Sequence, residues 1–287
     1  MEFGVQIFGC MSLCKKDPEG FFRTLAESGY RQIEPCVLFD DPVLLAEKAR
    51  LEGNEFMLGL LDNIWKPEEV SEYIKIMKNY DLQLSSVHVF ADHLNKSTEW
   101  MIETAKKNQI SAYVVNCNQD TIETDYMDFA KECSELSKRL KETGIELWLH
   151  NNGAEMKAKV EYNGQQVPVL SAILELCRED HVGAQIDVGW VLYGGVDPVE
   201  YLHHCKDFIR SIHFKDLKRD FATRTDGDIF ACLGDGALNV LDILAHLPQL
   251  KAGTTVLVDQ DVSDGDIMKD MTISYQVLSE AMNSLKA

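Results

Sequence analysis

The stretch VGAQIDVGW, residues 182–190, is the clearest indication of the fold in this 287-residue chain. It is a short run rich in β-forming residues that ends in an acid, and the helix start Asp197-Pro198 follows it closely. The next such run, RSIHFKDL at 210–217, comes directly after that helical segment. A strand, a helix and another strand in close succession are typical of a parallel sheet, in which helices connect neighbouring strands.

The same alternation continues from one end of the chain to the other. Proline marks further helix starts at Asp17-Pro18 and Lys66-Pro67, and residues 121–144 have the apolar spacing of a long amphipathic helix. The predicted strands are Phe3–Phe8, Tyr30–Glu34, Gln83–Phe90, Ser111–Asn116, Ile145–His150, Val182–Asp187, Arg210–Lys215 and Thr254–Asp259. Eight such units without a linker or a break in composition predict one α/β domain over residues 1–287, a single (β/α)8 TIM barrel.

An open, doubly wound sheet is the alternative architecture. Such a sheet normally has a glycine-rich phosphate loop after its first strand, and the residues after Phe8, GCMSLCKKDPEG, contain no GxGxxG pattern. The barrel is therefore favoured. Two connections exceed the usual length, at 35–65 and at 216–236; we expect an extra helix around 42–51, and both connections are lid candidates.

Composition argues against several classes of function. The chain has 28 Lys plus Arg against 47 Asp plus Glu, a net charge of −19, and no basic stripe, so we expect no nucleic-acid partner. No apolar run approaches the roughly 18 residues that a membrane span needs, and the first residues lack the positive region of a secretory signal. The eight cysteines form no CxxC pair, so we expect reduced thiols in a cytoplasmic protein.

Polar side chains stand at nearly every predicted strand end, and in a parallel barrel these ends converge on one mouth. They are Glu34, His88, Asn116 with Asn118, His150 with Asn151 and Asn152, Asp187 with Trp190, His213 with Lys215, and Asp259 with Gln260 and Asp261. Buried carboxylates and imidazoles without a shared cation would leave charges and lone pairs unsatisfied. One divalent metal explains the set: nitrogen and oxygen ligands without a thiolate suit Mn²⁺, our first expectation, or Mg²⁺, Co²⁺ or Zn²⁺.

Several residues at this mouth are candidates for binding substrate, namely Glu34, His88, Asn152 and Trp190. Trp190 follows Asp187 by three residues, and aromatic faces pack against the C–H surfaces of sugars. Structural alternatives stay open, because Glu34 could pair with a lysine and His88 could be an ordinary hydrogen-bonding group.

Lys215 is a further candidate for the pocket. It lies two residues after His213, on the same side of the predicted strand. It could instead be a solvated charge.

These motifs resemble those of the xylose isomerase-like barrel family, which holds sugar-phosphate isomerases and epimerases, inosose dehydratases and relatives of apurinic endonuclease family two. The resemblance spans essentially the whole chain. The similar segments are GYRQIEPC (29–36), LWLHNNGAEM (147–156), VGAQIDVGWVLYGGVDPVEYL (182–202), RSIHFKDL (210–217), CLGDGALN (232–239) and TTVLVDQDVSDGD (254–266).

The resemblance implies a single metal held by side chains from strands five to eight. Asp187 matches the family's sixth-strand aspartate, and His213 matches its seventh-strand histidine. His150 matches a position that is glutamate in many members and histidine in one branch. Glu155 matches an acidic residue just beyond it in that branch, which makes it a further candidate metal ligand.

Two positions depart from the family pattern. Asp259 stands where glutamate is usual, and its side chain is shorter by one carbon–carbon bond, about 1.5 Å. Asp261 could replace it as the ligand from the eighth strand. Asn152 stands where the branch has a second histidine, which removes a group that could transfer a proton.

We therefore expect a metal-dependent sugar isomerase or epimerase that removes a proton next to a carbonyl through an enediolate. His150 is the expected base, Glu155 orients it or completes the metal shell, and Lys215 faces the developing oxyanion. The expected substrate is a small carbohydrate, a keto sugar or related polyol.

Three alternatives stay open. The same site could serve a lyase or dehydratase of the inosose or 3-keto-glycoside type, or the chain could bind sugar without turnover. A DNA-repair nuclease, also found in the family, would need more histidines and a basic groove. By analogy with the family, we also expect a homo-oligomer.

Overall fold

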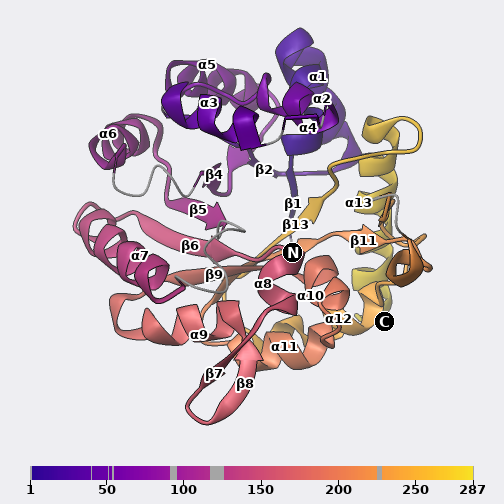
Figure 1. Cartoon of the computed structure of the whole chain (residues 1–287). Helices are drawn as coiled ribbons and strands as arrows, with labels where there is room; N and C mark the ends of the chain where they lie inside the picture. Colours follow the sequence, from indigo (N-terminus) through magenta and orange to yellow (C-terminus); the bar gives the residue numbers. More distant parts are fainter. Residues whose placement is uncertain are drawn as a thin grey trace.

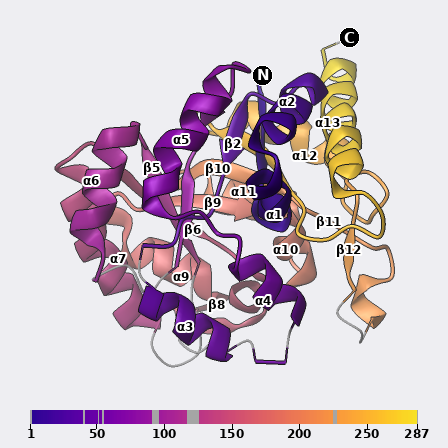
Figure 2. The ribbon, with the colours of Figure 1, turned by 90° about the horizontal axis from the view of Figure 1, so that it is seen from above.

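The computed structural model describes residues 2–39, 41–50, 52–53, 55–90, 96–116, 126–224 and 228–286. Within them, parallel strands form a nearly closed barrel that helices surround (Figures 1 and 2). The barrel strands are β1 (Phe3–Gln6), β2 (Gln32–Glu34), β3 (Gln83–Leu84), β4 (Val87–Val89), β5 (Ala112–Asn116), β6 (Glu146–His150), β9 (Gly183–Asp187), β10 (Ile209–Phe214) and β13 (Thr255–Asp259). They are hydrogen-bonded in the order β3-β2-β1-β13-β10-β9-β6-β5-β4, which confirms the predicted barrel fold.

The third barrel strand is interrupted where the sequence predicts one strand over 83–90. β3 pairs with β2 and β4 pairs with β5, while Ser85 and Ser86 lie between the two pieces. A parallel bridge between Cys36 and His88 joins the two sides of the barrel at this point. The hydroxyl of Ser86 donates a hydrogen bond to Glu34, so the break contributes a polar contact to the barrel interior.

Helices lie outside the strands, and their starts agree with the sequence. The Asp17 carboxylate accepts a hydrogen bond from the Gly20 N–H at 3.0 Å, and Gly29, with φ of 114°, ends the same helix. The helices are α1 (Met11–Lys16), α2 (Pro18–Ser28), α3 (Asp41–Arg50), α4 (Glu55–Leu61), α5 (Pro67–Lys78), α6 (Thr98–Asn108), α7 (Tyr126–Lys141), α8 (Gly153–Lys157), α9 (Val169–Leu176), α10 (Val188–Tyr193), α11 (Pro198–Cys205), α12 (Val240–His246) and α13 (Ile267–Ser284).

Two predicted helices differ in extent from the observed ones. The long helix predicted at 121–144 is described as α7 from Tyr126 onward, and 121–125 lie outside the described residues. The extra helix predicted around 42–51 is present as α3, and a further helix, α4, follows it in the same connection.

Two small antiparallel ribbons interrupt the alternation of strands and helices. β7 (Lys159–Tyr162) and β8 (Gln165–Pro168) form a hairpin that projects away from the barrel in Figure 1. Its turn, Asn163-Gly164, has positive φ at both residues, as a tight hairpin requires. β11 (Asp216–Leu217) and β12 (Phe230–Ala231) pair across the long connection after β10.

Apolar side chains from the strands and from the inner faces of the helices form one large buried cluster. Trp65 in this cluster is fully buried and stacks on Tyr73 with 4.3 Å between ring centroids. The seven cysteines that the structure describes are unbridged. Among the described residues, no helix combines the length and the apolar character that crossing a bilayer would need.

The connection after β10 is folded around the carboxylate of Asp216, which is 2% exposed. This carboxylate accepts hydrogen bonds from four backbone N–H groups at 2.8–3.0 Å, those of Leu217, Gly234, Gly236 and Leu238. A Cβ at position 236 would lie 2.2 Å from an Asp216 carboxylate oxygen, so the close approach requires glycine. One buried side chain thus fixes the loop that borders the mouth of the barrel.

Asp216→Ala should therefore destabilise the protein by about 3 kcal/mol, because it leaves several buried N–H groups without an acceptor. Urea unfolding followed by circular dichroism measures the change. Asp235→Asn, at an exposed position of the same loop, is the matched control and should stay within about 0.5 kcal/mol of wild type. Equal stability of the two variants would contradict this role of Asp216.

Candidate functional site

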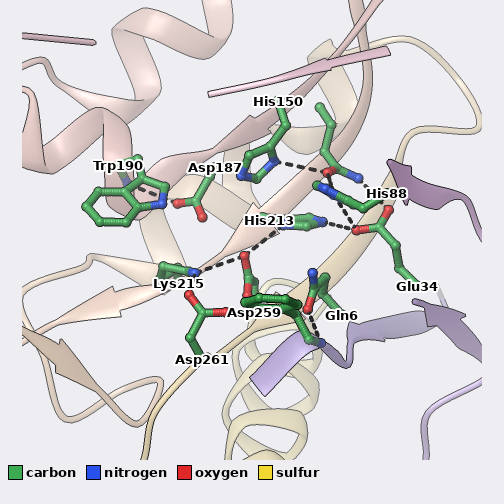
Figure 3. A network of polar contacts seen from close by, with 12 residues as sticks. Gln6, Glu34, His88, His150, Asp187, Trp190, His213, Lys215, Asp259 and Asp261 are labelled. Carbon is green, nitrogen blue, oxygen red and sulfur yellow. Dashed lines mark hydrogen bonds and ion pairs between the residues drawn. The ribbon is translucent and has the colours of Figure 1, made fainter. Parts of the chain in front are cut away.

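Side chains from six barrel strands meet in one buried network at the carboxyl ends of the strands (Figure 3). Strand pairing places His213 beside Asp187, and it places Asp259 beside Gln6. The strand-end residues in the network are Glu34 of β2, His88 of β4, His150 of β6, Asp187 of β9, His213 of β10 and Asp259 of β13, each no more than 7% exposed. Asn118, another predicted strand-end residue, lies outside the described residues.

Four of these residues form a group that could hold one metal ion: His150, Asp187, His213 and Asp259. One potential ligand atom from each lies within 4.8 Å of the corresponding atoms of the others. Oδ2 of Asp187 and Oδ1 of Asp259 are buried and have no hydrogen-bond partner. Burying a carboxylate oxygen without a partner is costly, and a shared divalent cation would supply the partner to both. The donor set fits such an ion.

The backbone around Asp187 holds its carboxylate in this group. Its Oδ1 accepts the N–H of Trp190 at 2.9 Å at the start of α10, which leaves Oδ2 for the group. The Asn151 side chain bonds to both the N–H and the carbonyl of Asp187, at 2.9 and 3.0 Å. A Cβ at Gly189 would lie 2.1 Å from the carbonyl oxygen of Lys215, so only glycine lets α10 start this close to β10.

Burial, opposed by the charge of Lys215 and assisted by that of Asp259, raises the pKa of Asp187 to about 7. A carboxylate in this position is ionised at neutral pH only at a cost in free energy. A bound cation would remove that cost.

His213 lies between two carboxylates. Its Nε2 is 2.8 Å from Glu34 Oε1, and its Nδ1 is 3.1 Å from Asp259 Oδ2. Burial alone would lower the pKa of His213, but the carboxylates of Glu34 and Asp259 outweigh burial and raise that pKa to about 10. Histidine ligands commonly donate their second N–H to a carboxylate, which orients the ring. Glu34 is placed to do this for His213.

Glu34 is fully buried, with hydrogen-bond donors beside one carboxylate oxygen and two imidazoles at ion-pair distance from the other. Ser86 and Gln185 donate to Oε2, while His88 and His213 lie beside Oε1. Burial opposes ionisation of this group, but the charges of His88 and His213 hold its pKa well below the usual range. The substrate-binding roles predicted for Glu34 and His88 stay predictions. Their contacts favour a role in orienting the side chains of the metal group.

Lys215 is buried, and its ammonium group is paired with two carboxylates. Nζ lies 2.6 Å from Asp261 Oδ2 and 3.1 Å from Asp259 Oδ2. Burial would lower the pKa of Lys215, but the two aspartates raise it well above its ordinary value, so the side chain is a cation. Asp261 pairs with Lys215 and is not in the metal group among the described residues, which favours Asp259 as the ligand from the eighth strand.

Aromatic rings form a wall beside this cation. The Lys215 ammonium lies 5.8 Å from the ring centroid of Trp190 and 5.2 Å from that of Phe230. Trp190 also packs edge-to-face against Phe230 and Tyr193, at 5.5 and 5.3 Å. The role predicted for Trp190, as a wall of a sugar pocket, stays a prediction.

Glu155 lies on α8, just past the end of β6, and is fully buried. The backbone N–H of Asn152 donates to its Oε2 at 3.1 Å, and its Oε1 has no hydrogen-bond partner. Burial raises the pKa of Glu155 to about 7. Among the described residues it does not join the metal group, so its predicted role as a ligand stays a prediction.

Gln185, which was not among the predicted site residues, is fully buried and bonds to Glu34, His88 and His150. It lies two residues before Asp187 on β9. The strand period places both side chains on the same face of the strand, and this spacing is the feature that could have identified it.

Comparison with known proteins agrees with this fold. The family model described as xylose isomerase-like TIM barrel matches residues 22–265. An inosose dehydratase from Geobacillus kaustophilus is 24% identical over 253 residues, which cover 83% of this chain and 78% of that protein.

Solved structures are similar in fold at low identity. A sugar phosphate isomerase/epimerase from Parabacteroides distasonis has a TM-score of 0.69 at 16% identity, covering 99% of this chain and 94% of that one. A xylose isomerase-like TIM barrel protein from Mycobacterium smegmatis in complex with magnesium has a TM-score of 0.64 at 14% identity, covering 100% and 98% of the two chains.

Asp187→Asn tests whether this buried carboxylate serves a cation. The raised pKa of Asp187, about 7 against an ordinary value near 4, means that folding penalises its charged form. The penalty is absent below about pH 4 and complete above about pH 7. At pH 8 in chelator, Asp187→Asn should therefore be more stable than wild type, by on the order of 2 kcal/mol.

The same variant should lose most of the thermal stabilisation that Mn²⁺ gives to wild type, measured by calorimetry with and without the metal. Asp128→Asn, at an exposed position on α7, is the control and should behave as wild type. A chelated Asp187→Asn protein that is less stable than wild type and still gains stability from Mn²⁺ would refute the assignment.

Proposed function

This chain belongs to the xylose isomerase-like TIM barrel family, and on that basis we propose that it is a divalent-metal-dependent isomerase or epimerase of a keto sugar or related polyol. The observation that supports the proposal most is the group of His150, Asp187, His213 and Asp259, with two buried carboxylate oxygens left without partners. The proposed reaction moves a proton on a carbon next to a carbonyl. It needs a group to take that proton and a positive charge to stabilise the resulting oxyanion.

The four residues of the metal group would hold the ion. When bound, a divalent ion polarises the substrate carbonyl and stabilises the enediolate, a contribution of roughly several kcal/mol. Mn²⁺ stays our first expectation, with Mg²⁺, Co²⁺ and Zn²⁺ as alternatives for the same donor set. The similar structure from Mycobacterium smegmatis, which contains magnesium, supports a divalent ion in this fold.

Proton transfer is assigned to Glu155 rather than to His150. His150 is the base expected from the sequence, but its ring lies within the four-residue group, which favours a role as ligand. Glu155 has one carboxylate oxygen held by the Asn152 N–H and the other without a partner. Its pKa of about 7 suits a group that takes a proton and returns it near neutral pH.

The remaining residues would orient the substrate and stabilise charge. Lys215, held as a cation by Asp259 and Asp261, would face the oxyanion that develops when the proton leaves. The faces of Trp190 and Phe230 would pack against the C–H surface of the sugar and exclude water from it. Return of the proton to the opposite face gives an epimer, and return to the neighbouring carbon gives an isomer.

A dehydratase is the second candidate, and the similarity to the inosose dehydratase from Geobacillus kaustophilus favours it. The first step is the same removal of a proton next to a carbonyl. The carbon–oxygen bond at the β-position then breaks, and the departing hydroxyl takes a proton and leaves as water. Both reactions use the same residues, so the products distinguish them. A homo-oligomer and the lack of a nucleic-acid partner remain predictions.

Incubation of the Mn²⁺-loaded protein with keto sugars and inosose-type compounds in deuterated water tests the proposal. We expect deuterium at the carbon next to the carbonyl, detected by mass spectrometry and proton NMR. Glu155→Gln should reduce the exchange rate by at least about 100-fold, the usual contribution of a positioned acid–base group, while it keeps the bound metal. A product that is lighter by one water would assign the dehydratase reaction instead.

His150→Gln separates the two roles of the histidine. Loss of bound metal would make it a ligand, and full metal content with loss of exchange would return the base to His150. Glu161→Gln, at an exposed position of the β7–β8 hairpin, is the matched control for the Glu155 variant and should keep full exchange. No exchange with any compound and any of the four metals would refute the proposed reaction.

A further inference from the structure

We propose that Gln185 is a positioning residue that fixes which nitrogen of His150 faces the metal group. Gln185 lies on β9, has no exposed surface, and follows the strand period of Asp187 into the barrel. The inference rests on the metal site of the proposed function. It concerns the orientation of one ligand, which can be measured without any substrate.

The contacts of Gln185 determine the orientation of its amide. One end lies 2.7 Å from Glu34 Oε2 and 3.3 Å from the Ser211 hydroxyl. Ionised carboxylates only accept hydrogen bonds, so this end must be the NH₂ group. The reverse orientation would place the amide oxygen against the Glu34 carboxylate. The network therefore permits one orientation only.

The carbonyl oxygen of Gln185 then faces two imidazoles. It lies 3.0 Å from His150 Nδ1 and 2.7 Å from His88 Nε2. Because a carbonyl oxygen can only accept, both rings must donate to it, and His150 carries its proton on Nδ1. The lone pair of the neutral ring is then on Nε2, the nitrogen that Figure 3 shows on the side of Asp187. That nitrogen can bind a cation.

Two neighbouring residues thus orient the two histidines of the metal group. Glu34 lies against Nε2 of His213, and Gln185 lies against Nδ1 of His150. In this arrangement the other nitrogen of each ring is left for the metal group. The amide of Gln185 donates to Glu34, so the two orienting groups are joined by a direct hydrogen bond inside the barrel. Loss of such an orienting partner commonly lowers metal affinity by 10- to 100-fold.

The test combines histidine NMR with metal titration. Long-range ¹⁵N–¹H correlation spectra of chelator-treated, histidine-labelled protein report which ring nitrogen has the proton, and His150→Gln assigns the signals of His150. Wild type should show His150 protonated on Nδ1. Gln185→Met, similar in size but without the acceptor, should lose this single tautomer and bind Mn²⁺ about 10- to 100-fold more weakly.

Ser211→Ala is the matched control, because it removes the weaker 3.3 Å contact to the same amide and leaves the contacts to both imidazoles. It should keep the His150 tautomer and the wild-type Mn²⁺ affinity.

Two results would overturn the inference: a wild-type His150 protonated on Nε2, or a folded Gln185→Met protein with unchanged tautomer and affinity. The wild-type spectrum decides the question even where Gln185→Met does not fold. Both readouts omit substrate, so failure of the proposed reaction and failure of this inference are separate outcomes.

Discussion

Two buried carboxylates, those of Asp187 and Asp259, impose the constraint on which the site depends. Each has an oxygen without a hydrogen-bond partner, and the two side chains are at most 4% exposed. A protein interior tolerates such groups only when a positive charge is close. Lys215 supplies part of this charge, and a divalent cation held by the four-residue group would supply the rest. The polar residues around the group give the other buried polar atoms their hydrogen-bond partners or opposite charges.

Local backbone features at the barrel mouth give these carboxylates their positions. Gly189 permits the start of α10 to approach β10 closely. The N–H of Trp190 then donates a hydrogen bond to Oδ1 of Asp187, and Oδ2 is available to the metal group. The break between β3 and β4 places Ser86 against Glu34, which in turn lies against His213. Elements far apart in the sequence thus determine the orientation of one small group of side chains.

Much of this could be predicted from the sequence, because a parallel barrel turns sequence order into spatial order. Strand ends meet at one mouth, so Asp187, His213 and Asp259 could be expected to converge, although they lie far apart in the chain. The strand-end residues already indicated a metal, and the resemblance of 147–156, 182–202 and 210–217 to a known family added the expectation that strands five to eight hold it. The dipeptide Asn163-Gly164 is a further local signal of this kind, because it is typical of a tight hairpin turn.

Other features depend on three-dimensional contacts that no local pattern reports. The alternation of residues 83–90 resembles one continuous strand, and only pairing with two different neighbours divides it. The two-residue spacing from Asp187 indicates which way the Gln185 side chain points, but it does not identify Glu34, His88 and His150 as its partners. Asp259 is favoured over Asp261 because, among the described residues, only Asp259 of the two has an oxygen close to the ligand atoms of His150, Asp187 and His213. Side-chain reach and burial, rather than sequence spacing, decide these points.

A crystal structure of the protein grown with Mn²⁺, with an anomalous difference map recorded at the manganese edge, shows directly whether these carboxylates share a cation. We expect a single strong peak at the barrel mouth, bound by His150, Asp187, His213 and Asp259, with Glu34 still against Nε2 of His213. A peak at another place, or a structure in which the Asp187 and Asp259 carboxylates point away from each other with no ion between them, would contradict it.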